Sequence, residues 1–116
     1  YDTIEFVGEH EMSVTNDTNR YVVDMATGRV IYKGDKSMNV KTFLGDTYTW
    51  VYNKDGNYKI LSLDGTVTET PVMKDISGTG SFSHGYSPVK IKGKWGIINS
   101  KGELVVQPTY DEITIL

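Results

Sequence analysis

Three aromatic residues alternate in the segment "TYTWVYN": Tyr48, Trp50 and Tyr52. Side chains two residues apart on a β-strand point to the same side, so a strand here would display the three rings as one stripe. An exposed stripe would stack against a sugar ring or dock against another protein. Alternatively, it packs under the segment "MNVKTF" or a neighbouring strand as local core. We take the three residues as the candidate ligand- or partner-binding site.

Other residues with reactive side chains are scattered along the chain. His10 and His84 lie 74 residues apart, and the sequence has no Cys and no third His to complete a zinc site. The segment "NKDGN" lacks the Glu that closes a calcium loop and favours a hairpin turn. No Ser lies in a Gly-x-Ser-x-Gly elbow, and the adjacent carboxylates of Asp111 and Glu112 would point to opposite sides of a strand. We therefore expect no catalytic residues, no metal site and no cofactor.

Short β-favouring runs separated by Gly-containing turns surround these residues. In "YNKDGNYKILSLDGTVTETPV" the turns "KDGN" and "LDG" are strong hairpin signals, because Gly and Asn accept a positive φ. The pattern predicts a three-stranded meander with strands at about 47–53, 58–63 and 66–72. No window has a sustained period of 3.6 residues, so we expect little helix.

The same pattern recurs at intervals of 37 residues without a gap. The middle strands begin at matching aromatic residues: Tyr21, Tyr58 and Trp95. The glycines of the following turns keep the same interval: Gly28, Gly65 and Gly102. This period predicts three repeats at approximately 4–40, 41–77 and 78–114.

The repeat also predicts which side chains share a face. Stacked repeats would bring three pairs into a shared core: Tyr21 with Val23, Tyr58 with Ile60, and Trp95 with Ile97. Gly96 would let a neighbouring backbone or ring approach closely. The gapless register aligns the aromatic stripe with polar residues of the first repeat, which are Glu11, Ser13 and Thr15. A one-residue gap in the third repeat would align it with Tyr86, Pro88 and Lys90.

The third repeat resembles a known family. "FSHGYSPVKIKGKWGIINSKGELVVQPTYDEI", residues 82–113, has the Phe-x-x-Gly opening, the Pro-Val strand, the Lys-Trp-Gly, the Gly turn and the closing Pro-x-Tyr-Asp of the WG (KWG) repeat. The first two repeats are degenerate, since Tyr replaces the Trp and the next residue is not Gly. The resemblance implies an all-β repeat protein of bacteria, often secreted or surface-attached and of mostly undefined function. It supplies no catalytic residues.

Composition narrows the possible partners. A chain of 116 residues is the size of one domain, and a net charge of -3 provides no attraction for the phosphate backbone of nucleic acid. No apolar run approaches the 18 or so residues of a membrane-spanning helix, so we expect no membrane insertion by this segment. The opening "YDTIEF" resembles the internal phrase "YDEITI", so we expect the chain to be part of a longer protein.

These observations predict a single all-β domain of three tandem β-meander repeats. The repeats form either an open curved stack or a closed pseudo-threefold body similar to a β-trefoil. The expected function is a non-enzymatic binding or interaction module of a bacterial surface or secreted protein, with a protein or glycan as partner. The alternative is a carbohydrate-binding module that uses exposed aromatic residues.

Overall fold

Twelve β-strands and the tight turns between them make up most of residues 3–115, which the computed structural model describes. The first sheet contains β1 (Thr3–Phe6), β2 (Glu11–Thr15), β3 (Asn19–Asp24) and β4 (Val30–Asp35). The second contains β5 (Asn39–Val40), β6 (Tyr48–Tyr52), β7 (Tyr58–Ser62) and β8 (Val67–Thr68). The third contains β9 (Ile76–Thr79), β10 (Tyr86–Ile91), β11 (Lys94–Asn99) and β12 (Leu104–Tyr110). Across the described residues the single helical element is the 3-10 helix η1 (Pro71–Asp75), so the all-β prediction is confirmed.

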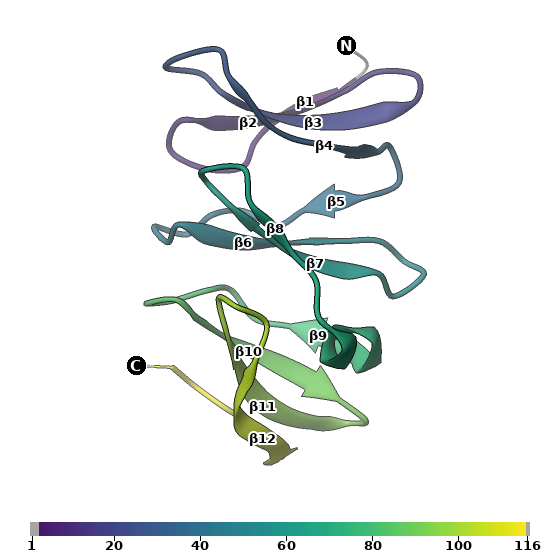
Figure 1. Cartoon of the computed structure of the whole chain (residues 1–116), viewed down its shortest axis with the longest axis vertical. Coiled ribbons are helices and arrows are strands. Elements are labelled where there is room, and N and C mark those ends of the chain that lie inside the picture. The colour runs from purple at the N-terminus through teal and green to yellow at the C-terminus, as the bar shows by residue number, and fades with distance from the viewer. Residues whose placement is uncertain (1–2, 116) are drawn as a thin grey trace.

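The three sheets are stacked along the longest axis of the molecule, which measures 42 × 28 × 19 Å (Figure 1). Each sheet is antiparallel and follows the order of the chain, and none of them closes on itself. The first and third sheets lie at opposite ends (Figure 1). The open stack is therefore confirmed, and the β-trefoil-like body is wrong. The first two residues of the opening phrase "YDTIEF" lie outside the described part of the chain.

Each unit has four strands, not the predicted three. The additional strand comes first in each sheet and pairs with the strand that follows it. These strands are short. In β5 and β9 the apolar and polar residues do not alternate, so the sequence did not predict them. The predicted strand at 66–72 is reduced to β8, because Pro71 cannot continue a ladder and starts η1 instead. The second and third sheets begin at Asn39 and Ile76, each two residues before the predicted start of a repeat.

The predicted glycine turns are present at Gly28, Gly56, Gly65 and Gly102, and all four residues have positive φ angles. The hairpins between the first two long strands of each sheet, however, differ in length. The aromatic residue at the start of each middle strand has a different partner position: Tyr21 pairs with Val14, Tyr58 with Tyr52, and Trp95 with Lys90, so the separations are seven, six and five residues. Each hairpin is thus one residue shorter than the one before it, and the gapless register fails across the turn.

This change in hairpin length decides which residues are equivalent. Trp50 pairs with Ile60, whereas Met12 pairs with Val23 and Pro88 pairs with Ile97. Trp50 therefore corresponds to Met12 and Pro88, and the predicted alignment with Ser13 is wrong. A slip of one residue moves every side chain of a strand to the other face.

Two hydrophobic clusters hold the sheets together, and the second sheet contributes to both. Val51 and Leu61 belong to the cluster that also contains Val22 of the first sheet. Trp50 and Ile60 point the other way, into the cluster that contains the core residues of the third sheet. Burial of one such side chain stabilises the fold by about 1.5 to 3 kcal/mol. The second sheet is consequently buried on both faces. This burial explains why the sequences of its long strands are nearly continuously apolar.

The predicted shared core is correct for one repeat. Ile60 is buried and Tyr58 packs against the same cluster. In the first sheet Val22 is the buried residue, so its neighbours Tyr21 and Val23 point away from the second sheet. The corresponding pair in the third sheet, Trp95 and Ile97, also points outward, because Ile98 faces the core.

The glycine of the Trp-Gly pair does have the predicted close neighbour. A Cβ added to Gly96 would lie 2.5 Å from the carbonyl oxygen of Val106 and 2.9 Å from the nitrogen of Pro108. The β11–β12 register is irregular between Trp95 and Ile97, and this bulge brings the β12 backbone over Gly96.

Candidate functional site

The central ring of the aromatic stripe is inaccessible. Trp50 has no exposed surface, and its indole N–H donates a hydrogen bond of 2.8 Å to the hydroxyl of Ser87. Its ring centroid lies 5.3 Å from that of Phe82. The third sheet covers this face of β6, so the stripe is not an exposed platform and the local-core alternative applies to Trp50.

The two tyrosines of the stripe are half-buried at the edge of the same cluster. Tyr52 stacks on Tyr58 with ring centroids 5.8 Å apart. Tyr48 packs against Phe82, also at 5.8 Å. Tyr48 in addition lines a groove between the second and third sheets, and it is therefore the residue of the predicted stripe that a ligand in this groove would contact.

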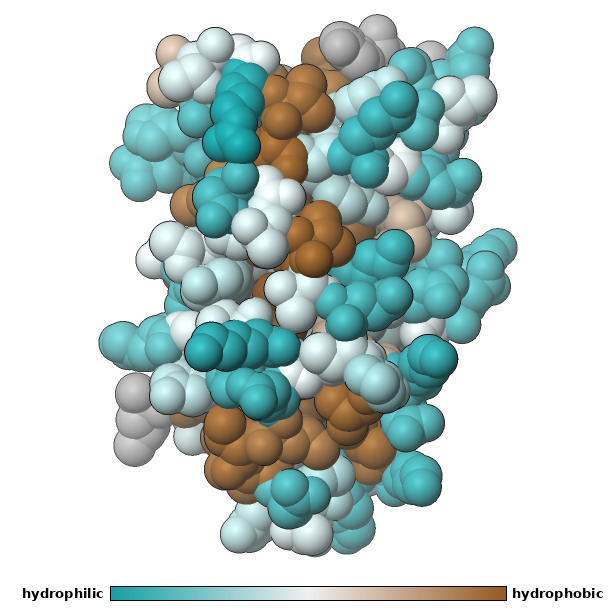
Figure 2. Space-filling view, viewed as in Figure 1, coloured by the Kyte–Doolittle hydropathy of each residue, from teal (hydrophilic) through white to brown (hydrophobic). Residues whose placement is uncertain are grey.

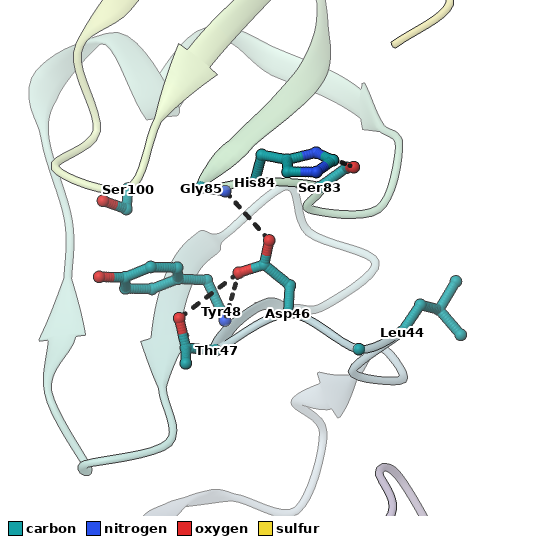
Figure 3. Close-up of a pocket in the computed structure, with 9 residues that line it drawn as sticks. Leu44, Asp46, Thr47, Tyr48, Ser83, His84, Gly85 and Ser100 are labelled. Atoms are coloured by element: carbon teal, nitrogen blue, oxygen red, sulfur yellow. Dashed lines mark hydrogen bonds between the residues drawn. The ribbon is translucent and has the colours of Figure 1, made fainter. Parts of the chain in front are cut away.

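The groove has a volume of about 660 Å³ and is shown in Figure 3. Its walls come from the loop that leads into β6, from the turn that precedes β10 and from the β11–β12 turn. The lining includes Leu44, Asp46, Tyr48, His84, Gly85 and Ser100. Segments about one repeat apart thus meet here, which the stacking of the sheets makes possible.

Asp46 holds the two walls of the groove together. One carboxylate oxygen accepts a hydrogen bond of 3.0 Å from the backbone N–H of Gly85 on the third sheet. The other accepts from the backbone N–H of Tyr48 at 3.2 Å (Figure 3). Hydrogen bonds to an ionised carboxylate are stronger than neutral ones. The Asp46 side chain therefore links the two walls directly, in addition to the hydrophobic cluster between the sheets.

The opposite wall is a tight turn with an unusual backbone. His84 and Gly85 have φ angles of 56° and 83°, and Ser83 and Tyr86 exchange two backbone hydrogen bonds. Two successive positive φ values are the signature of a type I′ hairpin. His tolerates this conformation better than most residues do. The turn presents the His84 imidazole at the groove, 3.0 Å from the hydroxyl of Ser83.

The chemistry of the groove is that of a polar, weakly charged binding surface. Hydroxyl groups, one imidazole and one aromatic ring line it, and its lining contains no Lys or Arg to attract an anion. The contact between Ser83 and His84 resembles the first half of a catalytic triad. Asp46, however, directs its oxygens at two backbone N–H groups and does not orient the imidazole.

The remaining candidates lie apart from one another. His10 lies in the β1–β2 turn next to Glu9, whereas His84 lies in the turn that precedes β10. Within residues 3–115 no group of three His, Asp or Glu residues is close enough to hold a metal ion. The "NKDGN" segment forms the predicted hairpin turn, in which the Asn53 side chain accepts backbone hydrogen bonds from Asp55 and Asn57. A search of the described residues for a helix long and apolar enough to cross a membrane finds none.

Sequence reasoning did not identify the groove. Its residues come from the second and third repeats, and no pattern within one segment joins them. A local signal did exist in "SHGY", where His-Gly between short polar and aromatic residues is compatible with a two-residue hairpin. That signal indicates the turn but not the loop that it faces.

Comparison with known proteins supports the repeat and the fold. The WG containing repeat matches residues 77–95 and 95–115. A comparison with curated proteins finds no match. Among solved structures, the chain is similar to BamB from Moraxella catarrhalis, with a TM-score of 0.56 and 19% sequence identity.

This likeness covers 93% of the present chain and 34% of the BamB chain, so the chain spans about a third of that protein's length. At this identity the likeness concerns the fold alone, which is β-propeller-like in BamB. The match of the repeat coincides with the third sheet and confirms the resemblance read from the Lys-Trp-Gly segment. Residues 77–115 of this chain match the model of the WG containing repeat.

Proposed function

We propose that the chain is a non-enzymatic interaction module and that it binds a partner protein in the groove beside Tyr48. The observation that carries this proposal is the groove itself, whose two walls belong to different sheets and are tied together by Asp46. A binding surface held by rigid sheets loses little conformational freedom when a partner binds.

The composition of the rim favours a protein as the partner. Leu44 is 66% exposed and lines the same groove as His84 and Ser83. An apolar side chain beside hydrogen-bonding groups is typical of protein interfaces, whose apolar contacts are surrounded by polar ones. Figure 3 shows Leu44 directed away from the Asp46 carboxylate, where an incoming chain could contact it.

A carbohydrate is the second candidate, and the partly exposed ring of Tyr48 favours it. Sugars bind to aromatic rings flanked by hydroxyl and amide groups, and Thr47 and Ser100 provide hydroxyls from the two sides of the groove. The Tyr48 ring already packs against Phe82 in a tilted arrangement, which leaves less surface for stacking. We propose a bacterial surface or secreted location on the strength of the family resemblance alone.

The test is to select ligands for the full chain from a random-peptide phage library and from a glycan array. Binding of each selected ligand is then compared for the wild type, Leu44→Asp and His84→Asn. Asn accepts the positive φ of His84, so the turn should be preserved. We expect each variant to weaken binding by about tenfold or more.

The matched control is Met25→Asp, which changes an exposed apolar residue in a turn of the first sheet. This variant should bind as the wild type does. Equal affinities for all four proteins would refute the groove as the binding site. A selection that returned glycans and no peptides would refute the protein partner and support the alternative.

A further inference from the structure

Two tight turns of the second sheet contain an Asp followed by a Gly, and the sequence has no other such pair. Asp55 and Gly56 lie between β6 and β7, whereas Asp64 and Gly65 lie between β7 and β8. In an Asp-Gly pair the backbone nitrogen of the Gly can attack the carboxyl carbon of the Asp, because no Cβ on the Gly obstructs the approach. The reactivity of each pair therefore depends on what holds its carboxyl group and its peptide nitrogen.

The two turns share one backbone arrangement. In the first turn the N–H of Asn53 donates to the carbonyl of Asn57 at 3.1 Å. In the second turn the N–H of Ser62 donates to the carbonyl of Thr66 at 2.9 Å. In both turns the Gly N–H donates to the carbonyl of the first residue, and the Gly has a positive φ. The turns consequently differ in their side chains and not in the path of the chain.

In the first turn the side chain of Asn53 accepts the backbone N–H groups. Its amide oxygen lies 3.0 Å from the nitrogen of Asp55 and 3.2 Å from that of Asn57. In the part of the chain that the structure describes, the Asp55 carboxylate accepts no hydrogen bond and forms no ion pair. This carboxyl group is therefore free to rotate toward the nitrogen of Gly56.

In the second turn the shorter side chain of Ser62 leaves one N–H for the aspartate. The Ser62 hydroxyl reaches the N–H of Asp64 at 3.5 Å, and the N–H of Thr66 donates to the Asp64 carboxylate at 2.8 Å. This hydrogen bond, with a smaller effect of the nearby Arg29, holds the pKa of Asp64 below its usual value. The ionised form is the less reactive one, because a carboxylate must take up a proton before its oxygen can leave as water.

The surroundings of the two turns differ in the same direction. Arg29 donates a hydrogen bond of 2.7 Å to the carbonyl of Asp64, and a Cβ on Gly65 would lie 3.1 Å from the carbonyl oxygen of Ile31. A Cβ on Gly56 would meet nothing within 4 Å, which leaves room for a ring. The β6–β7 turn projects from the side of the stack (Figure 1), and Figure 2 shows a hydrophilic surface on that side. Water therefore reaches the first turn.

We propose that Asp55 is a modification site, which converts to isoaspartate in the folded chain without an enzyme, while Asp64 is protected. The Gly56 nitrogen attacks Cγ of Asp55 to form a C–N bond, and the carboxyl hydroxyl group leaves as water with the proton of the nitrogen. Water then adds to one of the two carbonyl groups of the cyclic imide. Opening on one side restores aspartate, and opening on the other side gives isoaspartate, so water is the only co-reactant.

The modification changes the hairpin in which it occurs. Tyr52 and Tyr58 are the last paired residues before the turn, and their stacked rings have centroids 5.8 Å apart. Isoaspartate directs the main chain through the side-chain carbon and adds one carbon to the backbone between these two tyrosines. The hydrogen bonds that close the turn must then rearrange. The proposal is independent of the groove at Tyr48, to which the Asp55 turn does not contribute.

The first experiment incubates the full chain, folded and in urea, at neutral pH and follows both sites by peptide mass spectrometry. Isoaspartate leaves the mass unchanged and is recognised by a shifted retention time and by resistance to the endoproteinase Asp-N. In the folded chain it should form at Asp55 at least about tenfold faster than at Asp64, the factor that one hydrogen bond to a charged group provides. In urea the two rates should be similar. Equal rates in the folded chain, or no isoaspartate at Asp55, would refute the proposal.

The second experiment changes the side chain that opens the protected turn. Ser62→Asn should take the N–H of Thr66 away from the Asp64 carboxylate and accelerate isomerisation of Asp64. The third sheet supports this expectation, because Asn99 at the matching position accepts the N–H of Glu103 at 3.0 Å. An unchanged rate in this variant would overturn the explanation of why Asp64 is protected.

The reciprocal variant is Asn53→Ser, which should release the N–H of Asn57 to the Asp55 carboxylate and slow isomerisation there. A rate equal to that of the wild type would contradict the role of the free carboxylate. Asp55→Glu is the control, since it keeps the charge and its ring closes with one more carbon and much more slowly. This control should remove the signal from its peptide, and a signal that persisted would place the modification at another residue. Circular dichroism checks that the variants fold.

Discussion

Gly96→Ala should destabilise the third sheet although alanine adds a single methyl group. That methyl would lie 2.5 Å from the carbonyl oxygen of Val106, and 2.9 Å and 3.0 Å from the nitrogen and Cα of Pro108. All three are backbone atoms, which cannot turn aside as the end of a flexible side chain can. The β12 strand must therefore move, and its bulged pairing with β11 must stretch.

The magnitude follows from two opposing effects. Overpacking of a tightly packed site costs about 1 to 3 kcal/mol. Replacing Gly by Ala also restricts the unfolded chain, which stabilises the fold by about 0.4 to 1 kcal/mol where the backbone conformation suits alanine. Gly96 is not among the glycines with positive φ, so this gain applies. We expect a net loss of about 1 to 2 kcal/mol in the free energy of unfolding.

Urea denaturation followed by tryptophan fluorescence is the assay, and Gly78→Ala is the matched control. Gly78 lies in β9 of the same sheet, where an added Cβ would meet its nearest atom, the Cβ of Lys90, at an ordinary 3.6 Å. The control should be neutral or slightly stabilising. The midpoint should fall for Gly96→Ala while the m-value stays constant. Equal midpoints for the two variants would refute the prediction that a methyl group at Gly96 clashes with the β12 backbone.

Three further predictions concern buried and bridging polar groups. Ser87→Ala removes the acceptor of the buried Trp50 indole N–H and should cost about 1 to 3 kcal/mol in urea denaturation; an unchanged midpoint would contradict it. Asp46→Ala should accelerate amide hydrogen exchange at Gly85, which loses its acceptor, and an unchanged rate would show that the tie between the walls is dispensable. Burial raises the pKa of Tyr32 above 10.0, so its folded form keeps the proton longer than its unfolded form. The stability that Tyr32 contributes is present below pH 10 and should be lost as pH rises through the folded pKa; if Tyr32→Phe showed the same alkaline loss, another group would be responsible.

Local chemistry explains why the sequence predicts so much of this fold. Each glycine turn depends on a positive φ that neighbouring residues cannot alter, so Gly28, Gly56, Gly65 and Gly102 are recognisable without a structure. The alternating β-favouring runs between them are likewise local. Self-similarity along the chain then indicates a stack of like units, and the Lys-Trp-Gly segment indicates the family.

The first strand of each sheet and the groove could not be predicted from the repeat, because both depend on contacts that form only in the tertiary structure. The first strand of each sheet forms through pairing and has little local pattern, so it escaped prediction. The groove at Asp46 and Gly85 joins residues about one repeat apart, which no local pattern records.

The tertiary structure also determines which strand face is covered by a neighbouring sheet, and therefore which side chains are buried. The residues of the stripe are correct as a set that shares one strand face, yet exposure depends on what covers that face. Trp50 is buried because the third sheet lies against it, whereas Trp95, on the face of the third sheet that points away from the second, is half-exposed. A hairpin one residue longer or shorter reverses the faces of a strand. The 37-residue period is a property of the sequence, but the side to which each residue points follows from cross-strand pairing, which exists only in the folded chain.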